Sequence, residues 1–183
     1  MKIVVAISGA SGSIYARRLI DKLTESSEVE KIGLVFSIQA KRIWLEEAGE
    51  LPKSEKKIKI YDNNDYDAPF ASGSCTYNAM VICPCSSSTM SKIATGISDN
   101  LITRAADVML KERRKLIIVN RETPLNLIQI RNMESITLSG GIIMPASPGF
   151  YNKPQSIEEL VDTVVYRIMS ILQIKNEEKH WRE

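Results

Sequence analysis

Histidine and aromatic side chains are scarce in this chain of 183 residues, and each shortage excludes a class of protein. The single histidine, His180, lies in the charged C-terminal stretch. Neither a zinc site built on several histidines nor a Ser-His-Asp triad is therefore expected. Aromatic residues make up 6% of the chain, too few for a platform that stacks the bases of single-stranded nucleic acid. We expect no metal cofactor and no nucleic-acid partner.

Cysteines and long apolar runs are also few. Cys75, Cys83 and Cys85 are odd in number and lack the spacing of a redox pair, which favours reduced thiols in a cytoplasmic protein. No apolar run reaches the ~18 residues of a membrane span, and no signal peptide is visible. Lys and Arg number 24 against 22 Asp and Glu, a net charge of +2, so an anion must be bound by local groups. We expect no membrane partner.

Short apolar runs alternate with helical patterns along the chain. The predicted strands are residues 2–7, 32–36, 58–61, 79–83, 116–119 and 142–144. Helices are predicted around residues 16–23, over 38–47, 86–94 and 101–111, from Thr123-Pro124 onward, and from a capping box at Ser156 and Glu159 to about residue 172. Apolar strands that do not alternate and are separated by helices indicate a parallel sheet buried on both faces. The prediction is a three-layer α/β domain over residues 1–174, flavodoxin-like or Rossmann-like, with a charged tail over 175–183.

Ligands of such sheets bind beyond the carboxyl ends of the strands, so the residues after each strand are candidates. Two of these segments suit an anion, because both offer backbone N–H groups at the positive end of a helix dipole. Residues 9–13 form a glycine turn before a helix, and residues 86–89 place four hydroxyls at a helix start. The alternatives are a tight structural turn and simple helix capping. The glycines do not form G-x-G-x-x-G, so a dinucleotide fingerprint is not met.

Single polar residues after the other strands are further candidates. Ser37 offers one hydroxyl, for which helix capping is the alternative. Arg121 can bind phosphate, and Glu122 can act as a general acid or base, unless the two form a surface ion pair. Tyr151 lies in a loop shaped by Pro and Gly, and Arg167 lies near the apolar face of the last predicted helix.

Together these segments resemble the UbiX-type flavin prenyltransferases. The resemblance covers nearly the whole chain, and its most specific part is Arg-Glu-Thr-Pro-Leu with the downstream tyrosine loop. The motifs that carry it are Gly9-Ala10-Ser11-Gly12, Pro84-Cys85-Ser86, Ser98-Asp99-Asn100-Leu101, Thr103-Arg104-Ala105-Ala106-Asp107-Val108, Leu110-Lys111-Glu112-Arg113-Arg114, Arg121-Glu122-Thr123-Pro124-Leu125, Arg131-Asn132-Met133 and Phe150-Tyr151-Asn152-Lys153-Pro154-Gln155. The family has a flavodoxin-like or Rossmann-like fold. It joins a dimethylallyl group from dimethylallyl phosphate to reduced FMN, and the prenylated FMN serves UbiD-type decarboxylases.

The resemblance implies a role for each candidate. The implied FMN-binding residues are Gly9, Ala10, Ser11, Ser37, Ser86, Ser87, Ser88, Thr89 and Arg121. The prenyl phosphate would contact Lys111, Arg121, Tyr151 and Arg167. Glu122, with Glu47 and Ser11, would supply proton-transfer groups. The resemblance also implies a metal-independent reaction and a large homo-oligomer, commonly a dodecamer, with sites at subunit contacts.

One departure from the family concerns the second helix start. Many members have Cys-Ser-Met-Lys-Thr where this chain has Cys85-Ser86-Ser87-Ser88-Thr89, so a lysine is missing at Ser88. The missing charge is expected to lower the affinity for FMN more than it affects the chemistry. Three alternative functions stay open. One is a non-catalytic protein that binds or delivers FMN. Another is a flavin-dependent decarboxylase of related fold, although those enzymes rely on a histidine early in the chain, which is absent here. The third is a generic nucleotide-binding module, judged by fold alone.

Overall fold

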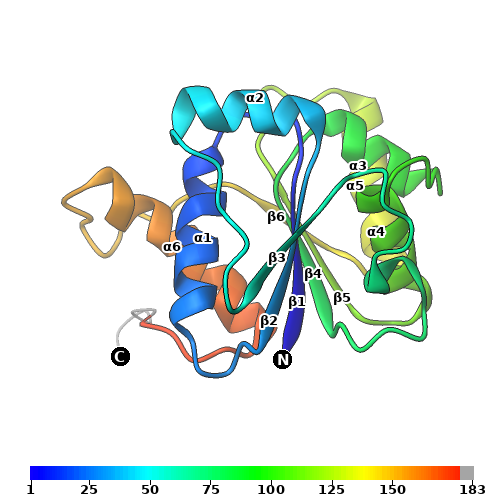
Figure 1. The fold of residues 1–183 in the computed structure, drawn as a ribbon. Helices are drawn as coiled ribbons and strands as arrows, with labels where there is room; N and C mark the ends of the chain where they lie inside the picture. Colours follow the sequence, from blue (N-terminus) through cyan, green and yellow to red (C-terminus); the bar gives the residue numbers. More distant parts are fainter. Residues whose placement is uncertain (178–183) are drawn as a thin grey trace.

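The sheet of this protein contains six parallel strands in the order β3-β2-β1-β4-β5-β6 (Figure 1). The structure is a computed structural model that describes residues 1–177. The strands are β1 (Lys2–Ile7), β2 (Lys31–Phe36), β3 (Ile58–Tyr61), β4 (Ala79–Cys85), β5 (Lys115–Asn120) and β6 (Ile142–Pro145). This order is the Rossmann-like arrangement, in which the direction of winding reverses between β1 and β4. The predicted α/β fold is confirmed.

Helices cover both faces of the sheet (Figure 1). The helices are α1 (Ser13–Glu25), α2 (Ile38–Glu47), α3 (Ser87–Ala94), α4 (Leu101–Lys111), α5 (Leu127–Leu138) and α6 (Ile157–Leu172), with a short 3-10 helix, η1, at Pro69–Ala71. α1 and α6 pack on one face, and α3, α4 and α5 pack on the other. α2 crosses above the carboxyl edge on the α1 side (Figure 1). No helix within residues 1–177 combines the length and the apolar character that a membrane crossing requires.

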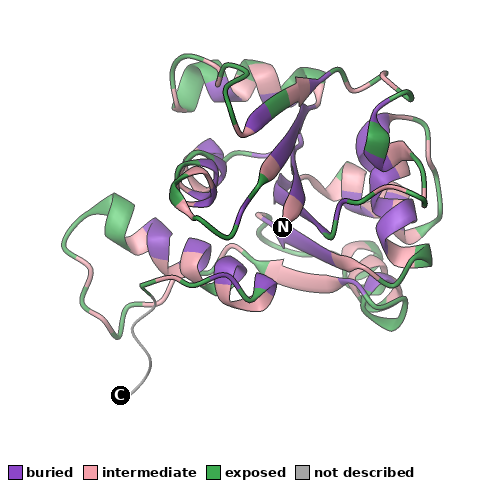
Figure 2. Ribbon diagram, turned by 60° about the horizontal axis from the view of Figure 1, so that its bottom comes forward, coloured by how far each residue is buried: buried purple, intermediate pink, exposed green. Residues whose placement is uncertain are grey.

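The strand sequences are apolar because helices cover both faces of the sheet. Alternate residues of β1 face opposite cores: Ile3 and Val5 pack toward α1 and α6, whereas Val4 and Ala6 pack toward α3 and α4. All seven residues of β4 are buried for the same reason. Figure 2 shows the central strands as buried and the edge strand β6 as only partly buried. A strand with two buried faces must be apolar at every position, which is why no alternation marks these strands in the sequence.

β4 extends beyond the end predicted at Pro84. Its pairing with β5 is regular as far as Ile82, shifts register, and resumes where Cys85 pairs with Asn120. Proline cannot donate to the ladder, but a shift in register lets the strand continue past it.

α5 begins at Leu127, so the prediction that Thr123-Pro124 opens this helix is wrong. The Thr123–Pro124 peptide bond is cis and lies in the preceding loop. The helix starts instead at a capping box, in which Asn126 accepts the N–H of Gln129 and Gln129 accepts the N–H of Asn126, both at 2.9 Å. These reciprocal bonds satisfy the first amides of the helix, which determines its start.

α6 begins at the predicted residue, but its cap is only half of the predicted capping box. The Ser156 hydroxyl accepts the N–H of Glu159 at 3.1 Å, whereas the Glu159 carboxylate accepts the N–H of Gln155 at 2.7 Å instead of that of Ser156. His180 and residues 178–183 of the predicted tail lie outside the described residues.

Candidate site at the carboxyl edge

Residues that follow β1, β2, β4 and β5 meet at the carboxyl edge of the sheet. The N–H of Ser37 donates to the carbonyl oxygen of Ile7 at 2.9 Å. The buried hydroxyl of Ser8 accepts the N–H of Ser86 at 2.8 Å. Nε of Arg121 donates to the carbonyl oxygen of Ser11 at 3.1 Å. These bonds bring together the segments that were predicted to bind FMN. They include Ser8, which directly follows β1 and was not among the predicted site residues.

The start of α1 is closed by a carboxylate of the same chain. Gly12 has a left-handed φ of 112°, and its N–H and that of Ser13 both donate to Oε2 of Glu47, at 2.9 and 2.8 Å. Glu47 is the last residue of α2. The N–H groups that residues 9–13 were predicted to offer to a ligand are therefore occupied at Gly12 and Ser13. Gly9 is exposed and Ala10 is buried in the same turn.

The position of Glu47 also changes its acidity. Partial burial raises the pKa of Glu47, but hydrogen bonds from the Ser11 hydroxyl and from the backbone N–H groups of Ser13 and Gly12 outweigh that effect. Its pKa is consequently below the ordinary value for a glutamate. Glu47 and Ser11, which were predicted to take part in proton transfer, thus lie close together beside the turn.

The start of α3 is open. Ser86 is its N-cap and accepts the N–H of Thr89 at 3.3 Å, so the capping alternative is confirmed for that residue. The backbone N–H groups of Ser87 and Ser88 have no hydrogen-bond partner within residues 1–177, and Ser88 is exposed. Two free N–H groups, flanking hydroxyls and the positive end of the helix dipole fit a phosphate group. Ser37 caps α2 in the same way, accepting the N–H of Ala40 at 3.1 Å.

Glu122 is part of a chain of hydrogen bonds instead of an ion pair with Arg121, so the ion-pair alternative is wrong. Oε2 of Glu122 accepts the hydroxyl of Ser87 at 2.9 Å, and the oxygen of Ser87 accepts Nε2 of Gln129 at 2.9 Å. The exposed carboxylate of Glu122 therefore lies at the open start of α3. The sequence analysis missed Gln129. Its spacing of three residues from Asn126, which is that of a capping box, was the available signal.

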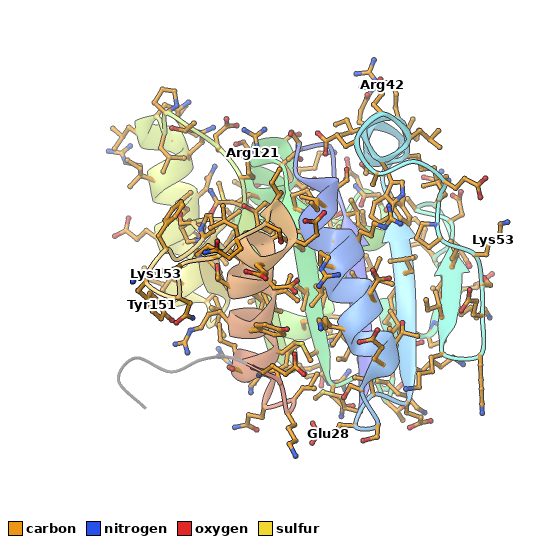
Figure 3. The ribbon with its side chains drawn as sticks, turned by 90° about the vertical axis from the view of Figure 1, so that its left-hand side faces the viewer. Glu28, Arg42, Lys53, Arg121, Tyr151 and Lys153 are labelled. Carbon is orange, nitrogen blue, oxygen red and sulfur yellow. The ribbon has the colours of Figure 1, made fainter. Side chains whose placement is uncertain are left out.

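The side chain of Arg121 spans the edge between the two helix starts. Only its Nε is used within the described residues, in the bond to Ser11, so both Nη groups are available to an anion. Figure 3 shows Arg121 near the carboxyl edge of the sheet.

Tyr151 and Arg167 are not brought to Arg121 within this chain. Tyr151 lies on the loop between β6 and α6, which extends away from the sheet, and Figure 3 shows it well apart from Arg121. Tyr151 lines a cleft of about 420 Å³. The charged residues that line this cleft are all acids: Glu159, Asp162 and Glu177. This acidic lining disfavours a phosphate. Arg167 is exposed on α6.

Lys111 lies at the opposite edge of the sheet. It ends α4, and β5 begins at Lys115, so Lys111 is close to the amino ends of the strands. Its Nζ is paired with the carboxylate of Glu112. The residues predicted to bind the prenyl phosphate are therefore not brought together within one chain.

The structure argues against a reactive thiol at Cys83 or Cys85 and against a metal-binding cluster within residues 1–177. Burial raises the pKa of both Cys83 and Cys85, which keeps these thiols protonated and unreactive. Among the described residues, 1–177, no group of three or more His, Cys, Asp or Glu side chains could hold a metal ion.

The fold and this edge define the class of protein: a Rossmann-like α/β protein with a phosphate-fitting helix start at its switch point. The chain belongs to the Flavoprotein family, whose family model matches residues 1–169. It is 47% identical over 178 residues to the flavin prenyltransferase UbiX of Methanocaldococcus jannaschii, a match that covers 96% of this chain and 95% of the relative. The resemblance to the UbiX-type enzymes is confirmed.

Two solved structures have closely similar folds. AnUbiX (PadA1), in complex with FMN and dimethylallyl pyrophosphate, matches with a TM-score of 0.89 and 37% identity, over 99% of this chain and 98% of that one. A dodecameric FMN-dependent UbiX-like decarboxylase from Escherichia coli O157:H7 matches with a TM-score of 0.91 and 33% identity, over 100% of both chains.

Proposed function

We propose that this protein is a flavin prenyltransferase, which transfers the dimethylallyl group of dimethylallyl phosphate to reduced FMN. The observation that carries the proposal is the pairing of an open, phosphate-fitting start of α3 with a carboxylate, Glu122, that Ser87 holds directly beside it. The identity of 47% to a flavin prenyltransferase over nearly the full length of both chains supports the same reaction.

The FMN phosphate would be held at the start of α3, by the N–H groups of Ser87 and Ser88 and the hydroxyls of Ser88 and Thr89, while Ser86 caps the helix and Ser87 holds Glu122. Gly9, Ala10, Ser11 and Ser37 would line the neighbouring part of the flavin site. When bound, the flavin supplies the nucleophilic ring atoms, so no nucleophilic side chain is needed. This requirement agrees with the buried, protonated thiols of the chain.

The side chains at the edge then have two tasks. Transfer of the dimethylallyl group breaks its C–O bond to phosphate and leaves negative charge on the departing phosphate oxygens, which the free Nη groups of Arg121 can stabilise without a metal. Glu122, exposed at the same edge, would exchange protons with the reacting ring. Glu47 and Ser11, which lie together beside the start of α1, would be a second group for proton transfer.

Lys111, Tyr151 and Arg167 would complete the prenyl-phosphate site in a homo-oligomer, predicted to be a dodecamer. Their separation within one chain supports this view, because neighbouring copies must then supply part of the site. Large exposed apolar side chains offer surface for such contacts, and they lie on α2, on α5 and in the loop of Tyr151: Ile38, Leu45, Leu127, Ile128, Ile130, Leu138 and Phe150.

The proposed recipient of the product is a UbiD-type decarboxylase. Unpaired Cys75, Cys83 and Cys85 support a cytoplasmic location.

The test is to mix the purified protein with reduced FMN and dimethylallyl phosphate without oxygen and then measure the mass of the extracted flavin. The proposal expects a flavin heavier by one dimethylallyl group, and no such product with oxidised FMN. Bound FMN of unchanged mass would instead indicate a storage or delivery protein. Release of carbon dioxide from a peptide ending in cysteine would indicate the decarboxylase alternative.

A further inference from the structure

We propose that Gln129 is a positioning residue that orients the Ser87 hydroxyl toward Glu122 and thereby holds the Glu122 carboxylate in place. This inference rests on the proposed function, in which Glu122 exchanges protons at the carboxyl edge. It assigns a role to a side chain on α5 that contacts Ser87 but does not itself contact Glu122.

The direction of each hydrogen bond in this chain follows from its donors and acceptors. The backbone N–H of Asn126 donates to Oε1 of Gln129 at 2.9 Å, which leaves Nε2 of Gln129 facing Ser87. Nε2 can only donate, so the oxygen of Ser87 accepts it. The single hydroxyl hydrogen of Ser87 is then left for Oε2 of Glu122, at 2.9 Å. A backbone amide at the start of α5 thus determines the orientation of a catalytic carboxylate.

Glu122 has little else to hold it. Its other oxygen, Oε1, accepts the N–H of its own neighbour Thr123 at 3.2 Å. Within residues 1–177, Ser87 is the only side chain that donates to Glu122, and Glu122 is exposed to solvent. An exposed carboxylate without that donor would populate several rotamers, and only some of them would point toward a substrate.

The same two helices carry a second link that provides a matched control. Nδ2 of Asn132 on α5 donates to the Ser91 hydroxyl on α3 at 2.8 Å, one turn further along both helices. This bond joins the same elements with the same kinds of side chain but does not contact Glu122. A loss that comes only from weaker packing of α5 on α3 should therefore appear equally at Asn132 and at Gln129.

The first variant is Gln129→Glu, which keeps an acceptor for the N–H of Asn126 and so preserves the capping box. It removes the donor to Ser87, and its carboxylate competes with Glu122 for the one hydroxyl hydrogen. We expect the single-turnover rate of flavin adduct formation to fall about tenfold, the scale of one lost hydrogen bond to a charged group, while FMN affinity changes less than about twofold. Asn132→Asp, the matched change, should leave the rate within about twofold of wild type.

The second set of variants tests whether Gln129 acts through Ser87. Ser87→Ala should slow the reaction about as much as Gln129→Glu, and Ser87→Thr, which keeps the hydroxyl, should restore most of the rate. The double variant that combines Gln129→Glu with Ser87→Ala should be no slower than Ser87→Ala alone, because both residues act through the same chain of hydrogen bonds. Rate losses that multiply in the double variant, or an equal loss in Asn132→Asp, would overturn the positioning role.

A readout without turnover separates this inference from the proposed function. In ¹H–¹⁵N spectra, Ser87→Ala and Glu122→Ala should each move the side-chain amide peaks of Gln129 and leave those of Asn132 in place. If the Gln129 peaks respond but wild-type protein forms no adduct, the proposed function fails while the linked chain from Gln129 to Glu122 stands. If the Gln129 peaks do not move in Glu122→Ala, the positioning role is wrong, whether or not the protein forms the flavin adduct.

Discussion

The starts of α1 and α3 both follow a central strand at the switch point of the sheet, yet only one of them is open to a ligand. At α1, the N–H groups of Gly12 and Ser13 both donate to Glu47. At α3, the N–H groups of Ser87 and Ser88 have no partner within residues 1–177. Every helix start has unpaired amides, but a neighbouring element decides whether a ligand can use them.

The closed start of α1 and the open start of α3 therefore have different roles in the site. The closed start of α1 gives its dipole a permanent counter-charge, which leaves Glu47 and Ser11 as a fixed pair beside the turn. The open start of α3 can receive a phosphate, and Glu122 lies beside it through Ser87. Arg121, bonded to Ser11, reaches across between the two.

The largest expected effect concerns the carboxylate at the open start. Glu122→Gln keeps the shape of the side chain but cannot exchange a proton, so we expect adduct formation in single turnover to slow about 100-fold with FMN affinity nearly unchanged. Glu134→Gln, on the exposed side of α5, is the control and should have no effect. An undiminished rate in Glu122→Gln would show that this carboxylate is only structural.

The turn at the closed start is constrained by its glycine. Gly12 has a φ of 112°, and a Cβ there would lie 3.1 Å from Cδ2 of Tyr15. Gly12→Ala should therefore lower the free energy of unfolding by about 2 kcal/mol, as strained left-handed positions do. Chemical denaturation measures this loss. Gly49→Ala, at a left-handed glycine with no atom near its Cβ position, should cost less. Equal losses would mean that the turn at α1 is not specially constrained.

Phosphate binding at the open start predicts a preference among flavins. Riboflavin, which lacks the phosphate, should bind about tenfold more weakly than FMN, the scale of one charge-assisted contact. Ser88→Lys adds a positive charge there and should tighten FMN about fivefold, an effect that added salt weakens. Fluorescence titration of both flavins provides the measurement. Riboflavin is the internal control, and a gain for riboflavin equal to that for FMN would contradict a phosphate site at α3.

The smallest expected effect is on stability at the closed start. The pKa of Glu47 is lowered in the folded protein, so its ionised form stabilises the fold above the ordinary glutamate pKa, and this contribution is lost as the pH falls through the lowered value. Glu47→Gln should cost about 0.5 kcal/mol at neutral pH, a small figure because the carboxylate is largely solvated. Denaturation curves of the two proteins should converge in strong acid. A gap that persists there would mean that the charge of Glu47 is not the cause.

Local patterns predicted most elements because each rests on neighbouring residues. β1 and α2 end where predicted. The start of α5 was missed because proline at a first helical position is only a tendency, and the Asn126–Gln129 box three residues later satisfies more amides. The end of β4 was missed because a register shift depends on the partner strand.

The candidate site likewise contains residues that local patterns predicted and a residue that only a distant contact identifies. Ser37, residues 86–89 and Arg121 were found because the carboxyl ends of parallel strands must share one edge. Gln129 was not found, since its contact with Ser87 joins residues 42 positions apart and depends on how α5 packs on α3. Tyr151 and Lys111 carry the right chemistry for a phosphate, but the fold places them away from Arg121.

Sequence patterns were enough to predict the parallel α/β sheet, the edge at which its ligand-binding segments meet and the resemblance to the flavin prenyltransferases, because periodicity and motif spacing are local properties of the chain. The packing of the helices was needed to show that Glu47 closes the start of α1, that the start of α3 is open and that Gln129 is linked to Glu122 through Ser87. The first and the last of these depend on hydrogen bonds between residues about 35 or 42 positions apart. Such bonds require exact distance and orientation, and those are set by how helices pack on the sheet.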